Sequence, residues 1–273
     1  MTIAGRRVSI LPGIFILIFF ATVQVCASYA QGTFRPGNLR PDPVDDKVAE
    51  RIGYAGKLVI AKRYDEAIAV YKTAHEMAGR PVFTIYMNMG YAYYEKGDYT
   101  AAANSYKQAA AIRPDDWSAY YSLAESLFAA GQYREAEIEY RRVLTFGIDP
   151  LTKAKTNNYL GLSLYKQKRI EQAIPKYKIA IELLNSHYSE AHNNLGTALM
   201  ENKEYEAAER EFRLAIEQEQ GFAEAYFNLA ISLEHLQRFR EAAEQYESYL
   251  KLNPGAEGTE KLLERIKWLK EKK

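Results

Sequence analysis

Three asparagines recur at one place in a repeating pattern of this sequence. Asn88, Asn194 and Asn228 each stand two residues before a glycine or an alanine. A side-chain amide offers both a donor and an acceptor, so it can pair with the backbone amide of a bound peptide of any sequence. The alternative is that asparagine at this place is only a tolerated, solvated residue. These residues therefore predict non-covalent recognition of a partner.

The residue types that make or break bonds are scattered along the chain. The nearest histidines, His187 and His192, are five residues apart on different helical faces and lack the spacing of a zinc site. We expect His192 to pack in a helix seam. No phosphate-binding glycine loop, nucleophile elbow or carboxylate pair stands out. The sequence therefore predicts a protein that is no enzyme, with no catalytic residue, cofactor or metal.

The elements that must position the asparagines repeat six times. Each repeat has a small residue, an alanine twelve residues later and an aromatic residue four further on. The small residues are Ala55, Gly90, Ala124, Gly161, Gly196 and Ala230, in steps of 35, 34, 37, 35 and 34 residues. A period in this range is typical of stacked supersecondary units.

Residues 117–150 show what one unit contains. Apolar residues at helical spacing predict a first helix over 117–130, ended by Gly131 in a left-handed conformation, and a second over 133–144. So short a turn makes the two helices antiparallel, with Ala124 and Ala136 where they approach most closely. Asp149 and Pro150 are expected to close the unit.

The fourth repeat is expected to be irregular. Pro175 falls inside its second helix, and three extra residues, 151–153, precede its first helix. Together these features predict a bent helix and a widened joint that divides the array into two halves of three repeats each.

The pattern resembles the signature of the tetratricopeptide repeat family. The run that carries the resemblance best is Tyr86, Met89, Gly90, Tyr93, Gly97, Tyr99, Ala102, Tyr106, Ala109 and Pro114. The resemblance covers 48–256, as repeats 48–81, 83–116, 117–150, 154–187, 189–222 and 223–256. It implies an all-α fold, a right-handed α-solenoid of six antiparallel helix pairs that ends in a solvating helix.

The same resemblance implies that the first helices line a concave, peptide-binding groove. The residues expected in that groove are Asn88, Tyr91, Tyr121, Ser122, Glu125, Asn158, Tyr159, Asn193, Asn194, Phe227 and Asn228. The three recurring asparagines would form a partial asparagine ladder like that of some superhelical members. The expected function is a scaffold or adaptor for a protein or peptide segment, whose identity the sequence does not reveal.

The two ends of the chain differ from the array. Arg6 and Arg7, an apolar run over 10–25 and small residues up to Ala30 predict an export signal over 1–30, cut after Ala30. The alternative is an uncleaved membrane anchor, although the run is shorter than the ~20 apolar residues of a spanning helix. A Pro-rich flexible linker over 31–47 and a C-terminal capping helix over 257–273, with Thr259 as its cap, are also expected.

The net charge and the N-terminal segment together predict where the protein acts. The formal charge of +1 and the lack of a basic run give no footprint for nucleic acid. An exported chain would be periplasmic and act in envelope assembly or secretion. The alternative is a membrane-anchored factor similar to the six-repeat pilotins of type IV pilus secretins. Those are lipoproteins, and Val25 before Cys26 fits a lipoprotein signal poorly.

Overall fold

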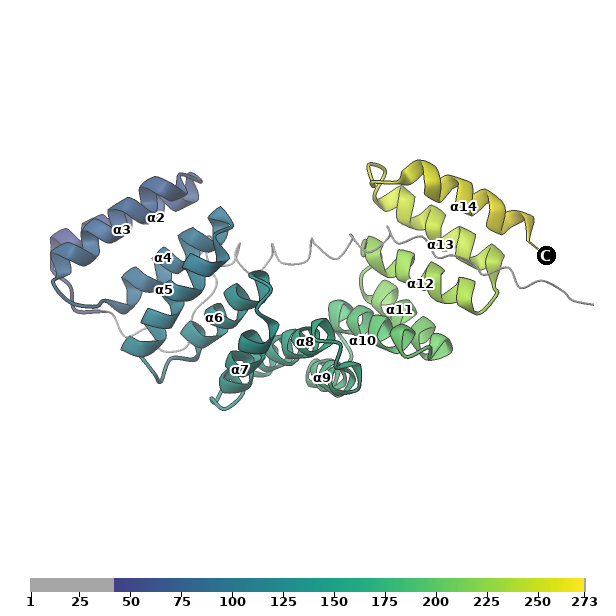
Figure 1. Cartoon of the computed structure of the whole chain (residues 1–273), viewed down its shortest axis with the longest axis horizontal. Coiled ribbons are helices and arrows are strands. Elements are labelled where there is room, and N and C mark those ends of the chain that lie inside the picture. Colours follow the sequence, from purple (N-terminus) through teal and green to yellow (C-terminus); the bar gives the residue numbers. More distant parts are fainter. Residues whose placement is uncertain (1–41, 273) are drawn as a thin grey trace, which may run out of the picture. The chain divides into compact units, whose positions relative to one another are not determined.

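The computed structural model describes residues 42–272, which fold into helices without a strand. The helices are α2 (Asp46–Ile60), α3 (Tyr64–Ala78), α4 (Phe83–Lys96), α5 (Tyr99–Ile112), α6 (Trp117–Ala129), α7 (Tyr133–Val143), α8 (Pro150–Lys166), α9 (Ile170–Leu183), α10 (Ser189–Glu201), α11 (Tyr205–Gln218), α12 (Ala223–His235), α13 (Phe239–Leu252) and α14 (Thr259–Glu271). Consecutive helices pack in pairs, from α2 with α3 to α12 with α13, and α14 packs on α13 (Figure 1). The predicted all-α solenoid of helix pairs is confirmed.

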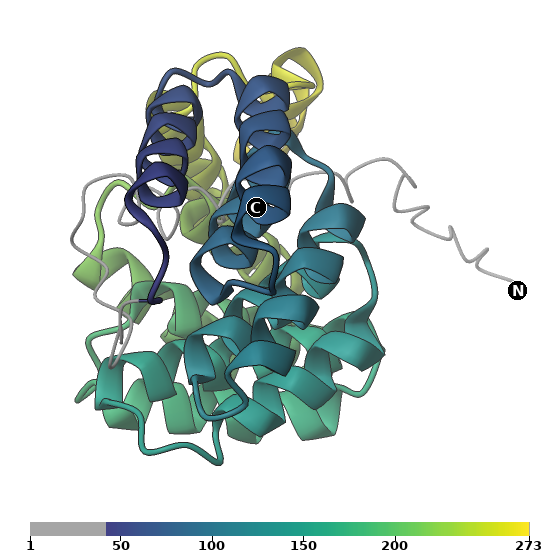
Figure 2. The same ribbon diagram turned by 90° about the vertical axis from the view of Figure 1, so that its left-hand side faces the viewer.

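Local chemistry sets where each helix begins and ends. Asp116 caps α6, because its side chain accepts hydrogen bonds from the backbone N–H and the hydroxyl of Ser118. After α6, Gly131 has a φ of 76°, and the next N–H, that of Gln132, bonds back to the carbonyl of Leu127. The predicted left-handed terminator is confirmed. Figure 2 shows the first pair, α2 and α3, from the N-terminal end of the array.

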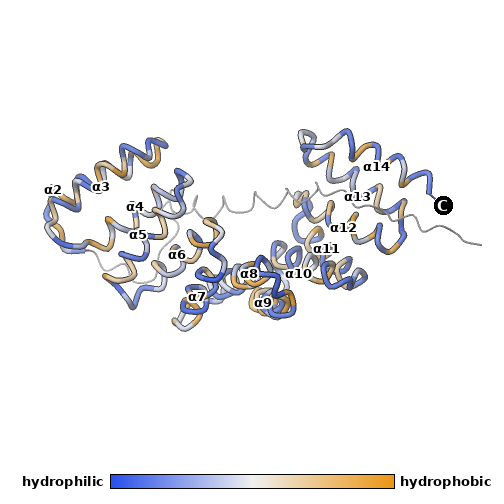
Figure 3. Tube along the Cα trace, in the orientation of Figure 1, coloured by the Kyte–Doolittle hydropathy of each residue, from blue (hydrophilic) through white to orange (hydrophobic). Residues whose placement is uncertain are grey.

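The small residue of each repeat makes room for the aromatic residue of the second helix. A Cβ atom added to Gly196 would lie 2.6 Å from Phe212, and one added to Gly161 would lie 2.7 Å from Tyr177. Carbon atoms that are not bonded to each other do not lie this close in proteins. Glycine is therefore required at these two positions for steric reasons. Ala124 and Ala136 are fully buried at the expected seam. Figure 3 shows the result, with apolar and polar segments alternating along the helices.

The three extra residues before repeat four do not widen the joint with a loop. Pro150 is the first residue of α8, and Asp149 caps the helix by accepting a hydrogen bond from Thr152 N–H at 3.0 Å. Proline suits this position because its missing N–H has no partner there anyway. The insertion therefore becomes an added first turn of α8. We expected Pro150 to close repeat three, over 117–150, but it begins helix α8.

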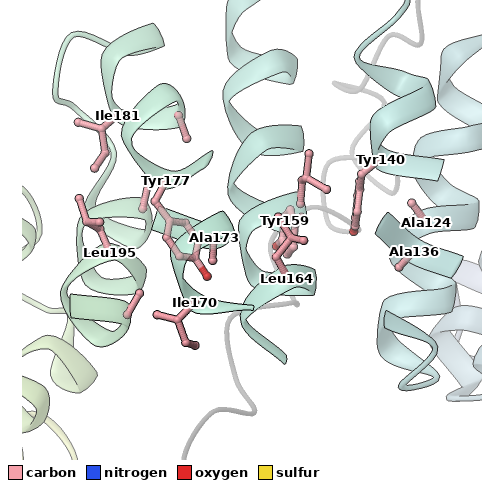
Figure 4. Close-up of a cluster of buried hydrophobic side chains, with 14 of the residues drawn as sticks. Ala124, Ala136, Tyr140, Tyr159, Leu164, Ile170, Ala173, Tyr177, Ile181 and Leu195 are labelled. Atoms are coloured by element: carbon pink, nitrogen blue, oxygen red, sulfur yellow. The ribbon is translucent and has the colours of Figure 1, made fainter. Parts of the chain in front are cut away.

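We expected the array to divide between repeats three and four, but its hydrophobic core does not divide there. One cluster of buried apolar side chains runs from Phe83 to Leu269 through this joint. Figure 4 shows part of it, including Tyr140 of α7 and Tyr159 of α8. Helix α9 continues through Pro175, which is exposed. The core divides elsewhere, because α2, α3 and one side of α4 form a separate cluster.

Both ends of the described chain are fixed by specific contacts. Asp42 accepts hydrogen bonds from the N–H and hydroxyl of Thr84, both at 2.7 Å, and pairs with Arg113 at 2.6 Å. Helix α2 starts at Asp46, within the expected linker, because Asp45 caps it. Helix α14 has Gly258 as its N-cap, in place of Thr259, whose hydroxyl bonds to the carbonyl of Ala256.

The expected export signal and most of the expected linker, up to residue 41, lie outside the described residues. Among the helices of residues 42–272, none combines the length and the apolar character needed to cross a membrane.

Candidate functional site

The residues predicted to line the groove lie on the first helices of repeats two to six. Asn88 and Tyr91 are on α4; Tyr121, Ser122 and Glu125 on α6; Asn158 and Tyr159 on α8; Asn193 and Asn194 on α10; Phe227 and Asn228 on α12. We call the surface that these eleven residues define the first-helix face. Three pairs of successive first helices also contact each other directly, α2 with α4, α8 with α10 and α10 with α12. These first helices therefore lie side by side in a layer.

The asparagines of this layer bond to one another. The Asn194 amide donates to Oδ1 of Asn158 at 3.0 Å, and the Asn228 amide donates to Oδ1 of Asn193 at 3.0 Å. In both bonds the donor stands two positions before the small residue of its own repeat. The acceptor stands three positions before the small residue of the preceding repeat. A ladder of amides therefore ties repeat four to five and five to six.

Asn158 is the hub of this ladder. Its side chain is completely buried, and its amide donates to Glu190 Oε1 at 3.1 Å and to the Tyr188 hydroxyl at 3.3 Å. Asn193 is also buried, and Asn88, Asn194 and Asn228 are partly buried. The alternative that asparagine at this place is only a tolerated, solvated residue does not hold for Asn194 and Asn228, because both are partly buried and bond to an amide of the preceding repeat. Asn88 differs, since it has no side-chain hydrogen bond among the described residues.

Tyrosines replace the amides where repeat three meets repeat four. The ring of Tyr140 lies 6.0 Å from those of Tyr121 and Tyr159, edge-on to the first and stacked on the second. Phe128 adds an edge contact to Tyr159 at 6.3 Å. Ser122 is buried beside them, and its carbonyl accepts the Ser126 hydroxyl at 2.8 Å. At the other end of the layer, Phe227 packs on Tyr246 of the seam.

Two carboxyl groups border this group of tyrosines. Burial raises the pKa of Glu125 to about 8, and it raises the pKa of Glu190 to about 7, despite the positive charge of Lys155 near both. Burial beside Glu125 likewise raises the pKa of Tyr121 and Tyr140 well above that of an exposed tyrosine. We call Tyr121, Glu125, Tyr140, Tyr159, Tyr188 and Glu190 the tyrosine–carboxyl cluster.

Sequence reasoning placed Tyr121, Glu125 and Tyr159 in the site but missed Lys155, Tyr188 and Glu190. A signal for two of them was available. Lys155 and Glu190 lie four residues before Tyr159 and Asn194, and residues four apart share a helix face. Tyr188 ends the loop before α10, where the helical period gives no guidance. Tyr140 was assigned correctly to the seam, although its hydroxyl also reaches the cluster.

The histidines take no part in a metal site in the described part of the chain, where no group of three potential ligands converges. His192 is buried at the seam, and its Nδ1 lies 2.7 Å from a carboxylate oxygen of Glu211. This contact joins α10 to α11, as the packing role implied. The arrangement of amides, aromatic rings and isolated carboxyls is suited to holding a chain segment.

Several known proteins are similar to this chain in sequence or in fold. Intraflagellar transport protein 70A of Danio rerio is 26% identical over 180 residues, 55% of this chain and 27% of the relative, so the chain matches only about a quarter of that protein. The solved structure of Pseudomonas aeruginosa PilF has a TM-score of 0.63 at 16% identity and covers 82% of this chain and 97% of its own. YrrB, described as a protein with an unusual peptide-binding site, has a TM-score of 0.54 at 21% identity, covering 72% and 97%.

A family model gives the most direct assignment. The tetratricopeptide repeat model matches residues 87–150, 159–222 and 195–257, which together make up more than half of the chain. These segments contain helices α5 to α7 and α9 to α13, together with parts of α4 and α8; Asn158 lies just before the second of them. The chain therefore belongs to the tetratricopeptide repeat family.

Proposed function

We propose that this protein is a non-catalytic scaffold or adaptor that binds an extended segment of a partner protein along its first-helix face. The observation that carries the proposal is the row of amides across successive first helices. Asn194 and Asn228 each use one N–H on the preceding repeat, which leaves a carbonyl oxygen and a second N–H on each side chain. An extended backbone presents donors and acceptors that such groups can meet at intervals.

Site-specific photo-crosslinking tests where the partner binds. A benzoylphenylalanine in place of Tyr91 lies on the first-helix face, and one in place of Ile138 lies on an exposed position of α7, a second helix. The proposal expects one partner adduct from the Tyr91 position in the native host and none from Ile138. The same adduct from both positions, or from Ile138 alone, would place the partner elsewhere.

Asn88 allows binding to be separated from stability. Asn88 has no side-chain hydrogen bond among the described residues, so its amide is available to a partner. Asn88→Ala should therefore lower the affinity for the partner by about 2–10-fold, which corresponds to one hydrogen bond. Its melting temperature should stay that of the wild type. Asn194→Ala and Asn228→Ala should lower both affinity and melting temperature, since each also breaks a bond between repeats. Unchanged affinity in all three variants would reject the ladder as a binding element.

We also propose that the protein is exported and acts in envelope assembly or secretion. The leader-like residues 1–30 support export. Mass spectrometry of the mature N-terminus tests this proposal. A chain that starts at Gln31 supports a periplasmic scaffold, whereas a lipidated Cys26 supports the pilotin-like alternative. An intact Met1 in the membrane fraction would indicate an uncleaved anchor.

A further inference from the structure

The tyrosine–carboxyl cluster contains polar groups that the protein itself leaves without partners. The side chain of Tyr140 is completely buried, yet its hydroxyl has no hydrogen-bond partner among residues 42–272. A buried polar group without a partner costs free energy, and one in a native structure calls for an explanation. Both Glu125 and Glu190 act electrostatically on this hydroxyl and on that of Tyr159. Both hydroxyls are therefore within electrostatic range of both carboxyls.

The carboxyls also lack a cation that would neutralise them. Other glutamates that reach a neighbouring repeat pair with an arginine, as Glu137 does with Arg169 at 2.6 Å and Glu209 with Arg238 at 2.7 Å. In the described chain no such ion pair forms at Glu125 or Glu190. Lys155 of α8 acts electrostatically on both carboxyls but forms an ion pair with neither. The two carboxyls therefore have no cation in ion-pair contact among the described residues.

We propose that the tyrosine–carboxyl cluster is a binding site for an arginine side chain of the bound partner segment. The proposal rests on the function proposed above and specifies the chemistry of the partner. A guanidinium group is planar, carries five donors and stacks on aromatic rings, so it can bond to the partly exposed carboxylates while it packs on the partly exposed ring of Tyr188. It is also less strongly hydrated than the ammonium group of lysine, which favours it in a partly buried site.

Binding of a cation here should release protons. The pKa values of about 8 for Glu125 and about 7 for Glu190 mean that the free site holds bound protons near neutral pH. A guanidinium group placed beside them stabilises the charged carboxylates and lowers their pKa values. The other ionisable groups that interact with the two carboxyls are Tyr121, Tyr140, Lys155, Tyr159, Tyr177, Tyr188 and Glu219.

The test uses small probes on the full chain. N-acetyl-arginine amide should bind saturably, with chemical-shift changes at the cluster tyrosines. Calorimetry near pH 7.5 in two buffers of different ionisation enthalpy should show proton release. N-acetyl-citrulline amide, the neutral isostere, and N-acetyl-lysine amide should bind at least about tenfold and about threefold more weakly, respectively. Equal binding of citrulline or lysine amide, or no saturable binding of arginine amide, would overturn the proposal.

Variants provide the second arm of the test. The double change Glu125→Gln with Glu190→Gln keeps side-chain shape, and it should weaken arginine amide by about tenfold or more and abolish proton release. Glu206→Gln, an exposed position on α11, is the matched control and should change neither. If the double variant fails to fold, the citrulline comparison on the wild type still decides. A partner crosslinked at Tyr91 together with absent arginine binding would refute only this inference and leave the proposed function standing.

Discussion

At the scale of single residues, Asn158 has more hydrogen bonds from its side chain than any other asparagine of the ladder. It bonds to Tyr188 and Glu190, and it accepts the amide of Asn194, all from the next repeat. A buried side chain that satisfies three partners at once is part of the fold as much as of the site. The first-helix face is thus partly assembled by its own polar groups.

Replacing this hub should therefore be costly. Asn158→Ala removes three hydrogen bonds and leaves Glu190 and Asn194 without them, so we expect a loss of about 2–4 kcal/mol in the free energy of unfolding. Urea denaturation measures it. Asn104→Ala, on an exposed position of α5, is the control and should stay within about 0.5 kcal/mol of the wild type. A similar small change for Asn158→Ala would show that the hub is not structural.

Glu125 should make stability depend on pH in an unusual direction. Its pKa is raised from 4.5 to about 8 by burial, so its contribution to stability is complete below about pH 4.5 and is lost as pH rises toward 8. Glu125→Gln should therefore gain stability relative to the wild type between pH 5 and pH 8, on the order of 1–3 kcal/mol. Melting temperatures of both proteins across this range check it, and a constant difference would contradict it.

The sequence predicted those site residues whose position follows from the repeat period. Asn194 and Tyr121 were found because helical spacing assigns them to a face. The contacts between Asn158 and Glu190, and the missing partner of Tyr140, could not be found, because they depend on how far each repeat is offset from the next. That offset is decided by packing between repeats, which a period within the chain does not encode.

At the scale of helices, the small residue of each repeat sets the distance between the two helices of a pair. Gly196→Val should lower the free energy of unfolding by about 1–3 kcal/mol, because even its Cβ would lie 2.6 Å from Phe212. The matched control is Gly53→Ala on α2, where a Cβ meets nothing within 4 Å. This control should gain about 0.5–1 kcal/mol from helix propensity. Equal effects of both variants would mean that the contact with Phe212 does not limit packing.

A second device links helices of successive repeats. Glu137 on α7 accepts hydrogen bonds from Arg169 at 2.6 Å and from Gln167 at 2.8 Å, both in the turn of the next repeat. Glu209 on α11 accepts one from Arg238 at 2.7 Å in the same relation. Burial tends to raise the pKa of Glu137, but its hydrogen bonds outweigh burial and hold that pKa below 4.5.

The sign of this shift gives a prediction opposite to that for Glu125. Because the folded pKa is lowered, the contribution of Glu137 is present above about pH 4.5 and is lost as pH falls through the lowered value. Glu137→Gln should cost about 1–3 kcal/mol at pH 7 and much less at pH 3. Denaturation at both values measures it, with Glu135→Gln, exposed on the same helix, as control. A cost that is the same at pH 3 would rule out the charged form as the cause.

Pro150 and Pro175 show at this scale why a proline alone does not decide where a helix ends. A proline excludes the helix interior but is favoured in the first turn, so the same residue can end one helix or start another. Asp149 before it decides the case by capping α8. Pro175 lies near the start of α9 and is exposed. Water can therefore donate to the carbonyl oxygen that would otherwise accept a hydrogen bond from the N–H that proline lacks.

At the scale of the whole array, the core is continuous from repeat two to α14 and separate in repeat one. We expect amide hydrogens of α2 and α3 to exchange through smaller openings than those of α6 to α12, because fewer buried apolar contacts hold them. Hydrogen exchange followed by mass spectrometry measures the difference. Equal protection throughout the array would contradict the division of the core.

The anchoring of Asp42 has a mechanical consequence. Its bonds to Thr84 and Arg113 join residues 42 and 71 positions apart, so the first helix pair sits inside a closed loop of chain. A pull on the segment ahead of Asp42 would reach the array at the start of α4 and the end of α5. Helices α2 and α3 would carry no tension until those bonds ruptured. The position of one aspartate thus makes the second repeat the force-bearing attachment point of the array.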